Sequence, residues 1–397
     1  MTVLTFVKHY LPGYKSGGPV RSLANLVGWL GEEFRFVVLA WDRDSLDERP
    51  YPGIEPGKAY RLGKADVIYL HKAQPHFLDL ARVIRRVEPD VLYLNSFFCW
   101  QFSLVPLLLR RLRLIPQLPV ILAPRGEFSP GALGLKTGRK RAFLAAAATS
   151  GLHDDVIWQA SSPLEESEIR RCIERSGRIV VARDLAAPLP QGVPRLGSRK
   201  KTSGCLRVVF LSRLTRKKNL LGALEILKQV TSRIEFYIYG TLRDPHYWAE
   251  CQTAIAALPS NVTVHYMGAI EHTEVHSVLE QYDLFFLPTL GENYGHVILE
   301  GLLAGCPVLI SDQTPWQDLT AAGVGWDLPL VRPDAFRSVL EQCAAMDAAT
   351  FAEWSARAVR YGMQKAADPE PLEANRRLLG GCRTWKPVAT SGSGPWK

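Results

Sequence analysis

Residues 283–315 (DLFFLPTLGENYGHVILEGLLAGCPVLISDQTP) place two apolar strands and one apolar helix in close succession. The run Leu284–Leu287 predicts a buried parallel strand, and a glycine-bearing turn follows it. An apolar helix over 296–304 comes next, and a second strand is expected over 307–310. Such a unit is typical of doubly wound α/β domains, in which the start of the helix is a natural anion site.

The chain has 397 residues, which is more than one comfortable hydrophobic core, and strands alternate with helices in both halves. We therefore predict an α/β fold class with two doubly wound, Rossmann-like domains that face each other across a cleft. The expected parts are a first domain at 1–183, a linker at 184–204, a second domain at 205–365, a helix within 366–385 that crosses back to the first domain, and a disordered tail at 386–397.

Charge is distributed unevenly between the two halves. Residues 1–200 contain 29 Lys and Arg against 19 Asp and Glu, and the remainder contains 19 against 20, for a net charge of +9. The basic first half indicates an anionic partner, either a phospholipid surface or a phosphate-bearing acceptor, or else a solvated basic surface. Basic stretches interleaved with aromatic residues are absent, so we expect no nucleic-acid partner.

No apolar run approaches 18 residues, and the first residues lack the pattern of a secretory signal. Seven cysteines lie far apart without a CxxC pair, which argues against a zinc site and a disulfide framework. We expect a cytoplasmic protein. Because the first half is basic, the protein could also bind peripherally at the inner face of the plasma membrane.

The beginning of the chain predicts a second ligand loop. Ser16 can cap a helix, Gly17 and Gly18 let the backbone approach a ligand, and Pro19 suits a first helical turn. A simple tight turn is the competing interpretation, and the dinucleotide pattern GxGxxG is absent. Residues 42–64 are polar and rich in proline and glycine, so we predict a loop there.

Asp42 and Asp44 have the spacing of a metal-binding DxD pair. We expect them not to bind metal, because they lie in the first half, and no histidine pattern for metal binding is visible. We therefore predict that the protein has no metal ligands and needs no cofactor.

Three stretches carry a resemblance to a known family. Residues 210–220 (FLSRLTRKKNL), 291–307 (GENYGHVILEGLLAGCP) and 10–23 (YLPGYKSGGPVRSL) resemble the GT-B glycosyltransferases of family 4, which are retaining enzymes that use nucleotide sugars. The similarity extends over roughly residues 1–365. Two further stretches resemble those of bacterial enzymes that build capsule, exopolysaccharide or O-antigen. They are residues 123–134 (APRGEFSPGALG) and the TPW triplet at 314–316.

This resemblance implies a role for each matching residue in the second domain. Arg213 and Lys218 would bind the donor diphosphate, and fixed cations stabilise the charge that develops on a departing phosphate. Glu292 and Glu300, with seven residues between them, would bind donor-sugar hydroxyls and ribose hydroxyls, respectively. The neighbouring residues whose amides would face phosphate or sugar are Asn293, Tyr294 and Gly295. Arg216 and Lys217 are interpreted as solvated neighbours.

In the first domain, the resemblance implies that Gly17 and Gly18 lie under the donor phosphates, where Arg21 either adds a cation or is a surface residue. Many family members have a histidine after the fourth strand, but here Asn95 and Ser96 occupy that level. Either Asn95 makes the polar contact or a residue of 125–127 does.

Glu127 follows a predicted strand and is a candidate general base. A salt bridge with Arg125 or Arg139 is an equally good interpretation. The predicted catalytic residues are thus Glu292, Arg213, Lys218 and Glu127.

The expected function is sugar transfer from a nucleotide diphosphate sugar to a hydroxyl of a glycan or of a lipid-diphosphate-linked acceptor, with retention at the anomeric carbon, in bacterial surface polysaccharide biosynthesis. One alternative is another enzyme of the same fold, a sugar-nucleotide epimerase or a phosphorylase, although no pyridoxal-binding lysine can be located for the latter. The other is a non-catalytic basic module that docks on a membrane.

Overall fold

The computed structural model describes the chain except residues 72–76, 135–136, 174–175, 189–200 and 385–397. Most of the predicted linker and the predicted disordered tail therefore lie outside the described residues. The chain divides into two compact units. The first contains Met1–Ser129, Leu133–Leu185 and Pro369–Lys397, and the second contains Pro130–Ala132 and Ala186–Asp368.

The first unit contains a sheet of eight described strands in the order β3-β4-β2-β1-β5-β6-β7-β8. All neighbours are parallel except β3, which pairs antiparallel with β4. The strands are β1 (Thr2–Phe6), β2 (Arg35–Trp41), β3 (Ala59–Leu62), β4 (Ala65–Leu70), β5 (Val91–Asn95), β6 (Val120–Ala123), β7 (Ile157–Ala160) and β8 (Ile179–Val181). The prediction of a continuous loop over 42–64 is wrong at β3. This short edge strand forms because its backbone pairs with that of β4.

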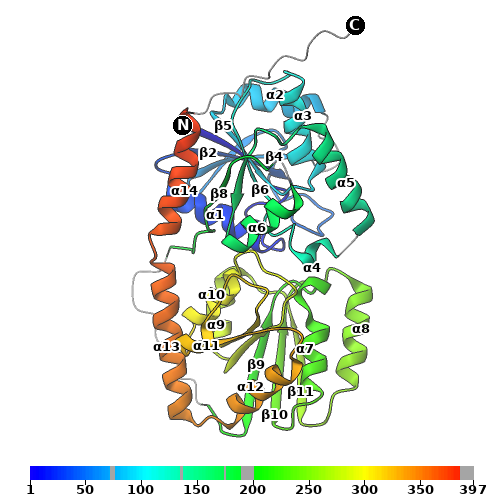
Figure 1. Cartoon of the computed structure of the whole chain (residues 1–397), viewed down its shortest axis with the longest axis vertical. Helices are drawn as coiled ribbons and strands as arrows, with labels where there is room; N and C mark the ends of the chain where they lie inside the picture. The colour runs from blue at the N-terminus through cyan, green and yellow to red at the C-terminus, as the bar shows by residue number, and fades with distance from the viewer. Residues whose placement is uncertain (72–76, 135–136, 174–175, 189–200, 385–397) are drawn as a thin grey trace. The chain divides into compact units, whose positions relative to one another are not determined.

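Helices connect these strands (Figure 1). They are α1 (Gly18–Leu30), α2 (Phe77–Val87), α3 (Val105–Arg111), α5 (Thr137–Ser150), α6 (Pro163–Cys172) and the late helix α14 (Glu370–Gly380), with a π-helical turn at Trp100–Leu104 before α3 and a 3-10 turn at Gly381–Thr384 after α14. The short helix α4 (Pro130–Leu133) follows β6 in the chain, but most of it belongs to the second unit. Helix α14 belongs to the first unit. Arg376 of α14 forms an ion pair with Glu33 (2.7 Å), and the Asn375 side chain donates to the carbonyl of Arg183 (2.7 Å).

The second unit contains a sheet of six described strands in the order β11-β10-β9-β12-β13-β14, and every pair is parallel. The strands are β9 (Cys205–Leu211), β10 (Arg233–Tyr239), β11 (Val262–Gly268), β12 (Leu284–Leu287), β13 (Val308–Ser311) and β14 (Gly325–Leu328). In the register of the central strand, Val208 lies opposite both Phe236 and Leu284. The predicted α/β fold class is confirmed in both units.

Helices lie on both faces of this second sheet (Figure 1). They are α7 (Leu220–Leu227), α8 (Pro245–Ala256), α9 (Val275–Leu279), α10 (His296–Leu303), α11 (Leu319–Ala322), α12 (Pro333–Ala345) and α13 (Ala348–Ala366), with 3-10 turns at Arg216–Lys218 and His272–Glu274. Every residue of β12 and β13 is buried, as expected for strands that are covered on both faces.

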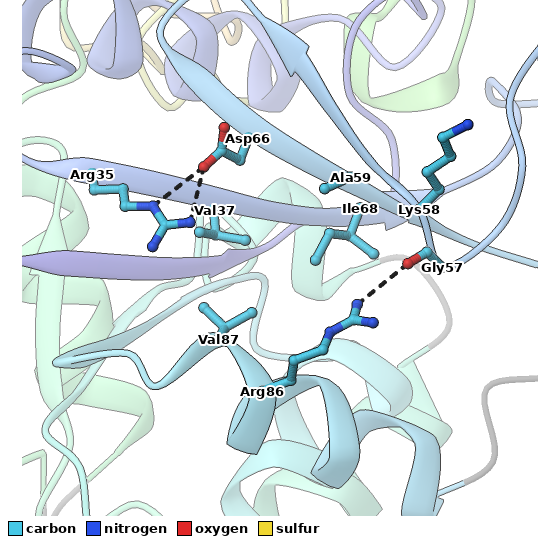
Figure 2. Close-up of a pocket in the computed structure, with 9 residues that line it drawn as sticks. All are labelled: Arg35, Val37, Gly57, Lys58, Ala59, Asp66, Ile68, Arg86 and Val87. Carbon is cyan, nitrogen blue, oxygen red and sulfur yellow. Dashed lines mark hydrogen bonds and ion pairs between the residues drawn. The ribbon is translucent and has the colours of Figure 1, made fainter.

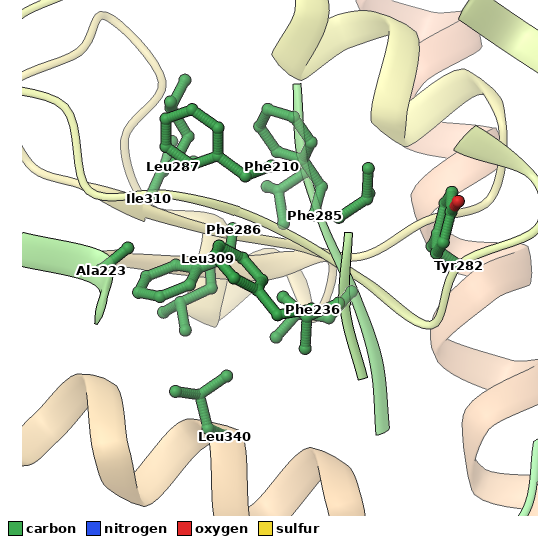
Figure 3. Close-up of a cluster of buried hydrophobic side chains, with 14 of the residues drawn as sticks. Phe210, Ala223, Phe236, Tyr282, Phe285, Phe286, Leu287, Leu309, Ile310 and Leu340 are labelled. Carbon is green, nitrogen blue, oxygen red and sulfur yellow. The ribbon is translucent and has the colours of Figure 1, made fainter. Parts of the chain in front are cut away.

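Aromatic side chains fill the core of the second unit (Figure 3). The ring of Phe236 lies 6.4 Å from the rings of both Phe210 and Phe286, and all three are fully buried. Leu340 of α12 packs into the same cluster. This continuous core makes the carboxyl ends of β9 and β12 rigid supports for the loops that follow them.

Candidate functional site

The second sheet reverses its direction of growth between β9 and β12. The chain adds β10 and β11 on one side of β9 and then β12 to β14 on the other. In doubly wound sheets, ligands bind beyond the carboxyl ends of the strands at such a point. The loop after β9 (residues 212–219) and the loop after β12 (residues 288–295) both leave it, and both contain predicted donor-binding residues.

Hydrogen bonds fasten these two loops to each other. The N–H of Leu290 and the hydroxyl of Thr289 both donate to the carbonyl of Lys217, at 2.8 and 3.1 Å. Asn219, which begins α7 in a left-handed conformation, donates from its side chain to the carbonyl of Pro288 (2.9 Å). The position of each loop is therefore fixed by the other.

Lys218 and Glu292 meet between the two loops, where the ammonium group contacts the carboxylate. Their side chains are only 9% and 12% exposed. Burial lowers the pKa of Lys218, and the positive charges of Arg213 and Lys217 lower it further. The protonated form of this lysine is thus stabilised by any additional negative charge that reaches it.

Arg213 is partly buried near Lys218, and burial lowers its pKa. Within the described part of the chain, its side chain has no hydrogen bond or ion pair. Its position depends on Gly240 at the end of β10, because a Cβ there would lie 1.7 Å from the carbonyl oxygen of Ser212. Such a partly buried guanidinium group favours an anionic ligand.

The glycine turn after β12 leads into α10. Gly291 and Gly295 both have positive φ (154° and 79°), and Gly295 is the residue at which α10 is capped. Asn293 and Tyr294 lie between them, and the indole N–H of Trp316 donates to the carbonyl of Tyr294 (2.6 Å). The structure therefore puts the predicted turn residues at the start of α10, where Trp316 of the TPW triplet supports them.

Glu300 lies in the second turn of α10 and accepts a hydrogen bond from Nε2 of His272 at 2.7 Å. The two side chains are 24% and 35% exposed. His272 follows β11, far from α10 in sequence, and the motifs gave no indication of it. Arg216, interpreted as a solvated neighbour, is exposed and pairs with Glu250 (2.5 Å).

In the first unit, the predicted glycine loop precedes α1. Gly17 caps the helix with φ of 68°, and the helix starts at Gly18 with Pro19 in its first turn. The prediction that Ser16 caps this helix is wrong, because the cap is Gly17 and has no side-chain hydrogen bond. A Cβ at Gly18 would meet no atom within 4 Å, so the backbone there is accessible.

Asp44 holds the segment before this glycine loop. Its carboxylate accepts from the N–H groups of Tyr14 (2.7 Å), Lys15 (2.9 Å) and Ser45 (2.6 Å), and it is 2% exposed. Asp42 pairs instead with its neighbour Arg43 (2.8 Å). The described residues include no group of three or more His, Cys, Asp or Glu side chains that could hold a metal ion.

Asn95 lies in a buried polar network at the end of β5. Its side chain donates to the hydroxyl of Thr5 (3.0 Å) and accepts from Arg125 (2.9 Å). Arg125 also donates to the hydroxyl of Tyr93 (2.7 Å) and forms an ion pair with Asp184, whose side chain is 4% exposed. Asn95 therefore supports the sheet end through Arg125.

Glu127 has partners other than the predicted arginines. Its carboxylate accepts from the hydroxyl of Ser96 (2.7 Å) and from the N–H groups of Phe97 (2.6 Å) and Phe98 (3.1 Å). The expected salt bridge with Arg125 is wrong, because that arginine pairs with Asp184. These bonds give Glu127 a role in holding the loop after β5.

A separate pocket of about 380 Å³ lies in the first unit, beside the amino-terminal ends of β2 and β4 (Figure 2). Its lining includes Arg35, Lys58, Arg86, Asp66, Val37 and Ile68. Figure 2 shows Arg35 paired with Asp66, and Arg86 donating to the carbonyl of Gly57. None of the predicted site residues lines it. No described helix combines the length and apolar character of a membrane span.

Part of the chain matches a family of glycosyl transferases. Residues 198–342 match the family described as Glycosyl transferases group 1. A curated relative, the amylovoran biosynthesis glycosyltransferase AmsK of Erwinia amylovora, is 31% identical over 147 residues, or 34% of this chain. The match spans about a third (35%) of that relative's own length.

Solved structures match over nearly the whole chain. A sucrose-phosphate synthase from Thermosynechococcus elongatus has a TM-score of 0.71 at 15% identity, covering 96% of this chain and 99% of that one. HepE of Anabaena, solved with UDP and glucose, has a TM-score of 0.67 at 15% identity, covering 97% and 100%. These structures confirm the predicted GT-B fold, and residues 198–342 are the part of the chain that matches the group 1 family.

Proposed function

We propose that this chain, a GT-B protein with a group 1 glycosyl transferase domain, is a retaining glycosyltransferase of bacterial surface polysaccharide biosynthesis. It would move a sugar from a nucleotide diphosphate sugar to a hydroxyl of a glycan or of a lipid-diphosphate-linked acceptor. The family match at residues 198–342 and the name of the relative AmsK support sugar transfer in polysaccharide biosynthesis. The UDP and glucose in the HepE structure support a nucleotide sugar as the donor.

The observation that carries the proposal is the group of cations where β9 and β12 end. Arg213 and Lys218 are close enough for the first to lower the pKa of the second, and burial lowers the pKa of both. Two cations held near each other away from water are stabilised by a ligand with two adjacent negative charges. A diphosphate has this character, and Glu292 beside Lys218 can accept sugar hydroxyls.

The proposed reaction breaks the bond between the anomeric carbon and the diphosphate oxygen and forms a bond between that carbon and the acceptor oxygen. The acceptor's hydroxyl proton passes to an oxygen of the departing diphosphate. Arg213 and Lys218 stabilise the charge that develops on this diphosphate, so orientation and electrostatics supply most of the rate enhancement.

Retention at the anomeric carbon rests on the resemblance, as does the expectation that no metal ion is needed. Attack on the face from which the diphosphate leaves gives retention without a carboxylate nucleophile. The anomeric configuration of the product, determined by NMR, tests retention, and full turnover after treatment with a chelator tests the independence from metal.

For the first unit, we propose an anionic partner, either an anionic membrane surface or the phosphate groups of the acceptor. The excess of ten positive charges in residues 1–200 supports it. Arg35, Lys58 and Arg86, all exposed at the rim of the pocket in Figure 2, supply part of that charge. Sedimentation with anionic and neutral liposomes at low salt tests the membrane alternative. This alternative is refuted if the protein sediments with neither kind of liposome.

The main experiment is a thermal-shift screen of UDP, GDP, ADP and their sugars, followed by nucleotide release with the donor that binds. A ligand at 100 times its dissociation constant adds about 2.7 kcal/mol of stability. Binding of none of them would overturn the proposed donor site. An epimerase would release free sugar without an acceptor, and a non-catalytic docking module would release no nucleotide.

A further inference from the structure

His272 lies beside α10, although the strand that precedes it is at the edge of the sheet. It follows β11, the edge strand, and starts the 3-10 turn His272–Glu274 that leads into α9. Helix α9 packs against α10 (Figure 1). The crossover between β11 and β12 therefore brings the imidazole to Glu300, although 28 residues separate the two.

The turn that presents His272 is itself well defined. Glu271 and Glu274 form reciprocal capping bonds around it, in which each carboxylate accepts from the other residue's backbone N–H. Val275 and Leu279 anchor the following helix in the core. The imidazole therefore occupies a fixed place relative to α10.

The bond between the two side chains has a defined direction. A carboxylate accepts only, so the Nε2 atom of His272 must carry the proton that it donates to Glu300. A carboxylate has about four lone-pair directions, so a carboxylate that accepts from an imidazole can accept from hydroxyl donors as well. The imidazole fixes the rotation of the carboxylate that those hydroxyls would meet.

We propose that His272 is a positioning residue that orients Glu300 toward the vicinal hydroxyls of a ribose, so that the site selects ribonucleotide over deoxyribonucleotide donors. This inference rests on the proposed donor site at α10. A carboxylate with a fixed orientation binds two adjacent hydroxyls together, and it loses one of these bonds when a hydroxyl is missing. A freely rotating carboxylate distinguishes the two nucleotides less well.

The test measures dissociation constants by calorimetry for the nucleoside diphosphate that binds wild-type protein and for its 2′-deoxy counterpart. In wild type we expect the ribonucleotide to bind about tenfold more tightly, the value of one charge-assisted hydrogen bond. His272→Ala and Glu300→Ala should each reduce this preference to less than about threefold. His272→Gln, which keeps a side-chain N–H, should restore it.

His276→Ala is the matched control, because His276 pairs with Glu280 (3.9 Å) in the same unit and does not contact Glu300. It should keep the wild-type preference. Loss of the preference in Glu300→Ala but not in His272→Ala would overturn the inference and leave the donor site intact. The proposed donor site itself would be refuted if the wild type bound no nucleoside diphosphate. It would also be refuted if Glu300→Ala bound the ribonucleotide and the deoxyribonucleotide with wild-type affinities. In either case the inference about His272 would be refuted too.

Discussion

Lys218 and Glu292 form an ion pair across 74 residues of sequence, with both side chains almost buried. The resemblance to family 4 gives these residues different tasks, one toward the diphosphate and one toward the sugar. Their contact brings the two proposed tasks to one point in the second unit. A donor that bound there would present its diphosphate to the lysine and its sugar to the carboxylate, on either side of the bond that breaks.

Replacement of either member of this pair should abolish most of the activity. We expect Lys218→Ala and Glu292→Ala each to lower kcat by about 10²–10³-fold, the usual effect of removing a group that stabilises developing charge or orients the reacting sugar. The measurement is nucleotide release under saturating donor, together with the unfolding temperature of each variant.

The surface pair Lys228 and Glu225 (2.6 Å) in the same unit provides the matched control. Lys228→Ala and Glu225→Ala should retain wild-type turnover. Near-normal rates in folded Lys218→Ala or Glu292→Ala would remove this pair from the mechanism.

The affinity for the donor should depend on pH through Lys218. Burial and neighbouring cations lower its pKa below the ordinary 10.5, and a bound diphosphate raises it again by supplying opposite charge. Binding therefore favours the protonated lysine, so affinity should fall as the pH rises through the lowered pKa of the free protein.

Calorimetry with a nucleotide sugar at a series of pH values measures this effect. Lys218→Arg is the control, since its guanidinium group stays protonated throughout. It should bind with an affinity that is much less dependent on pH. An equally flat profile in the wild type would show that Lys218 does not gain a proton when the donor binds.

Breaking the Arg125–Asp184 pair should destabilise the first unit. Both side chains are buried (7% and 4% exposed), so Arg125→Met leaves an uncompensated carboxylate. We expect a loss of about 3–5 kcal/mol in the free energy of unfolding, measured by denaturant titration. Arg35→Met, which breaks the exposed pair with Asp66 (3.2 Å), should cost at most about 1 kcal/mol. Equal effects of the two substitutions would contradict the structural role of Arg125.

Gly240 should be indispensable for the conformation of the loop after β9 (residues 212–219), which contains Arg213 and Lys218. An alanine there would bring Cβ to 1.7 Å from the Ser212 carbonyl and would also adopt φ of 150°. We expect Gly240→Ala to unfold the second unit or to displace Arg213 and abolish nucleotide binding. Gly268→Ala also requires positive φ (79°) but meets no atom within 4 Å, so it should cost only about 1–2 kcal/mol. Unchanged nucleotide binding in Gly240→Ala would contradict this expectation.

Much of the fold was predictable because its signals are local. The apolar runs of β12 and β13 and the glycine before α10 each appear within a few residues, and the structure places all of them as expected. The edge strand β3 was missed because it has only four residues and follows a stretch rich in proline and glycine, and its only partner among the described strands is β4. Ser16 was expected as a cap, but Gly17 takes that position with a conformation that favours glycine.

The sequence by itself determined the chemical groups of the candidate site, since motifs record which residue types follow each strand end. Only the tertiary structure decided which of these groups meet. In the folded chain, Lys218 pairs with Glu292 and His272 donates to Glu300. Arg125 forms its ion pair with Asp184 and not with Glu127. The physical reason is that the two partners of each pair lie in different connections between strands. Strand order, and not distance along the chain, sets their separation.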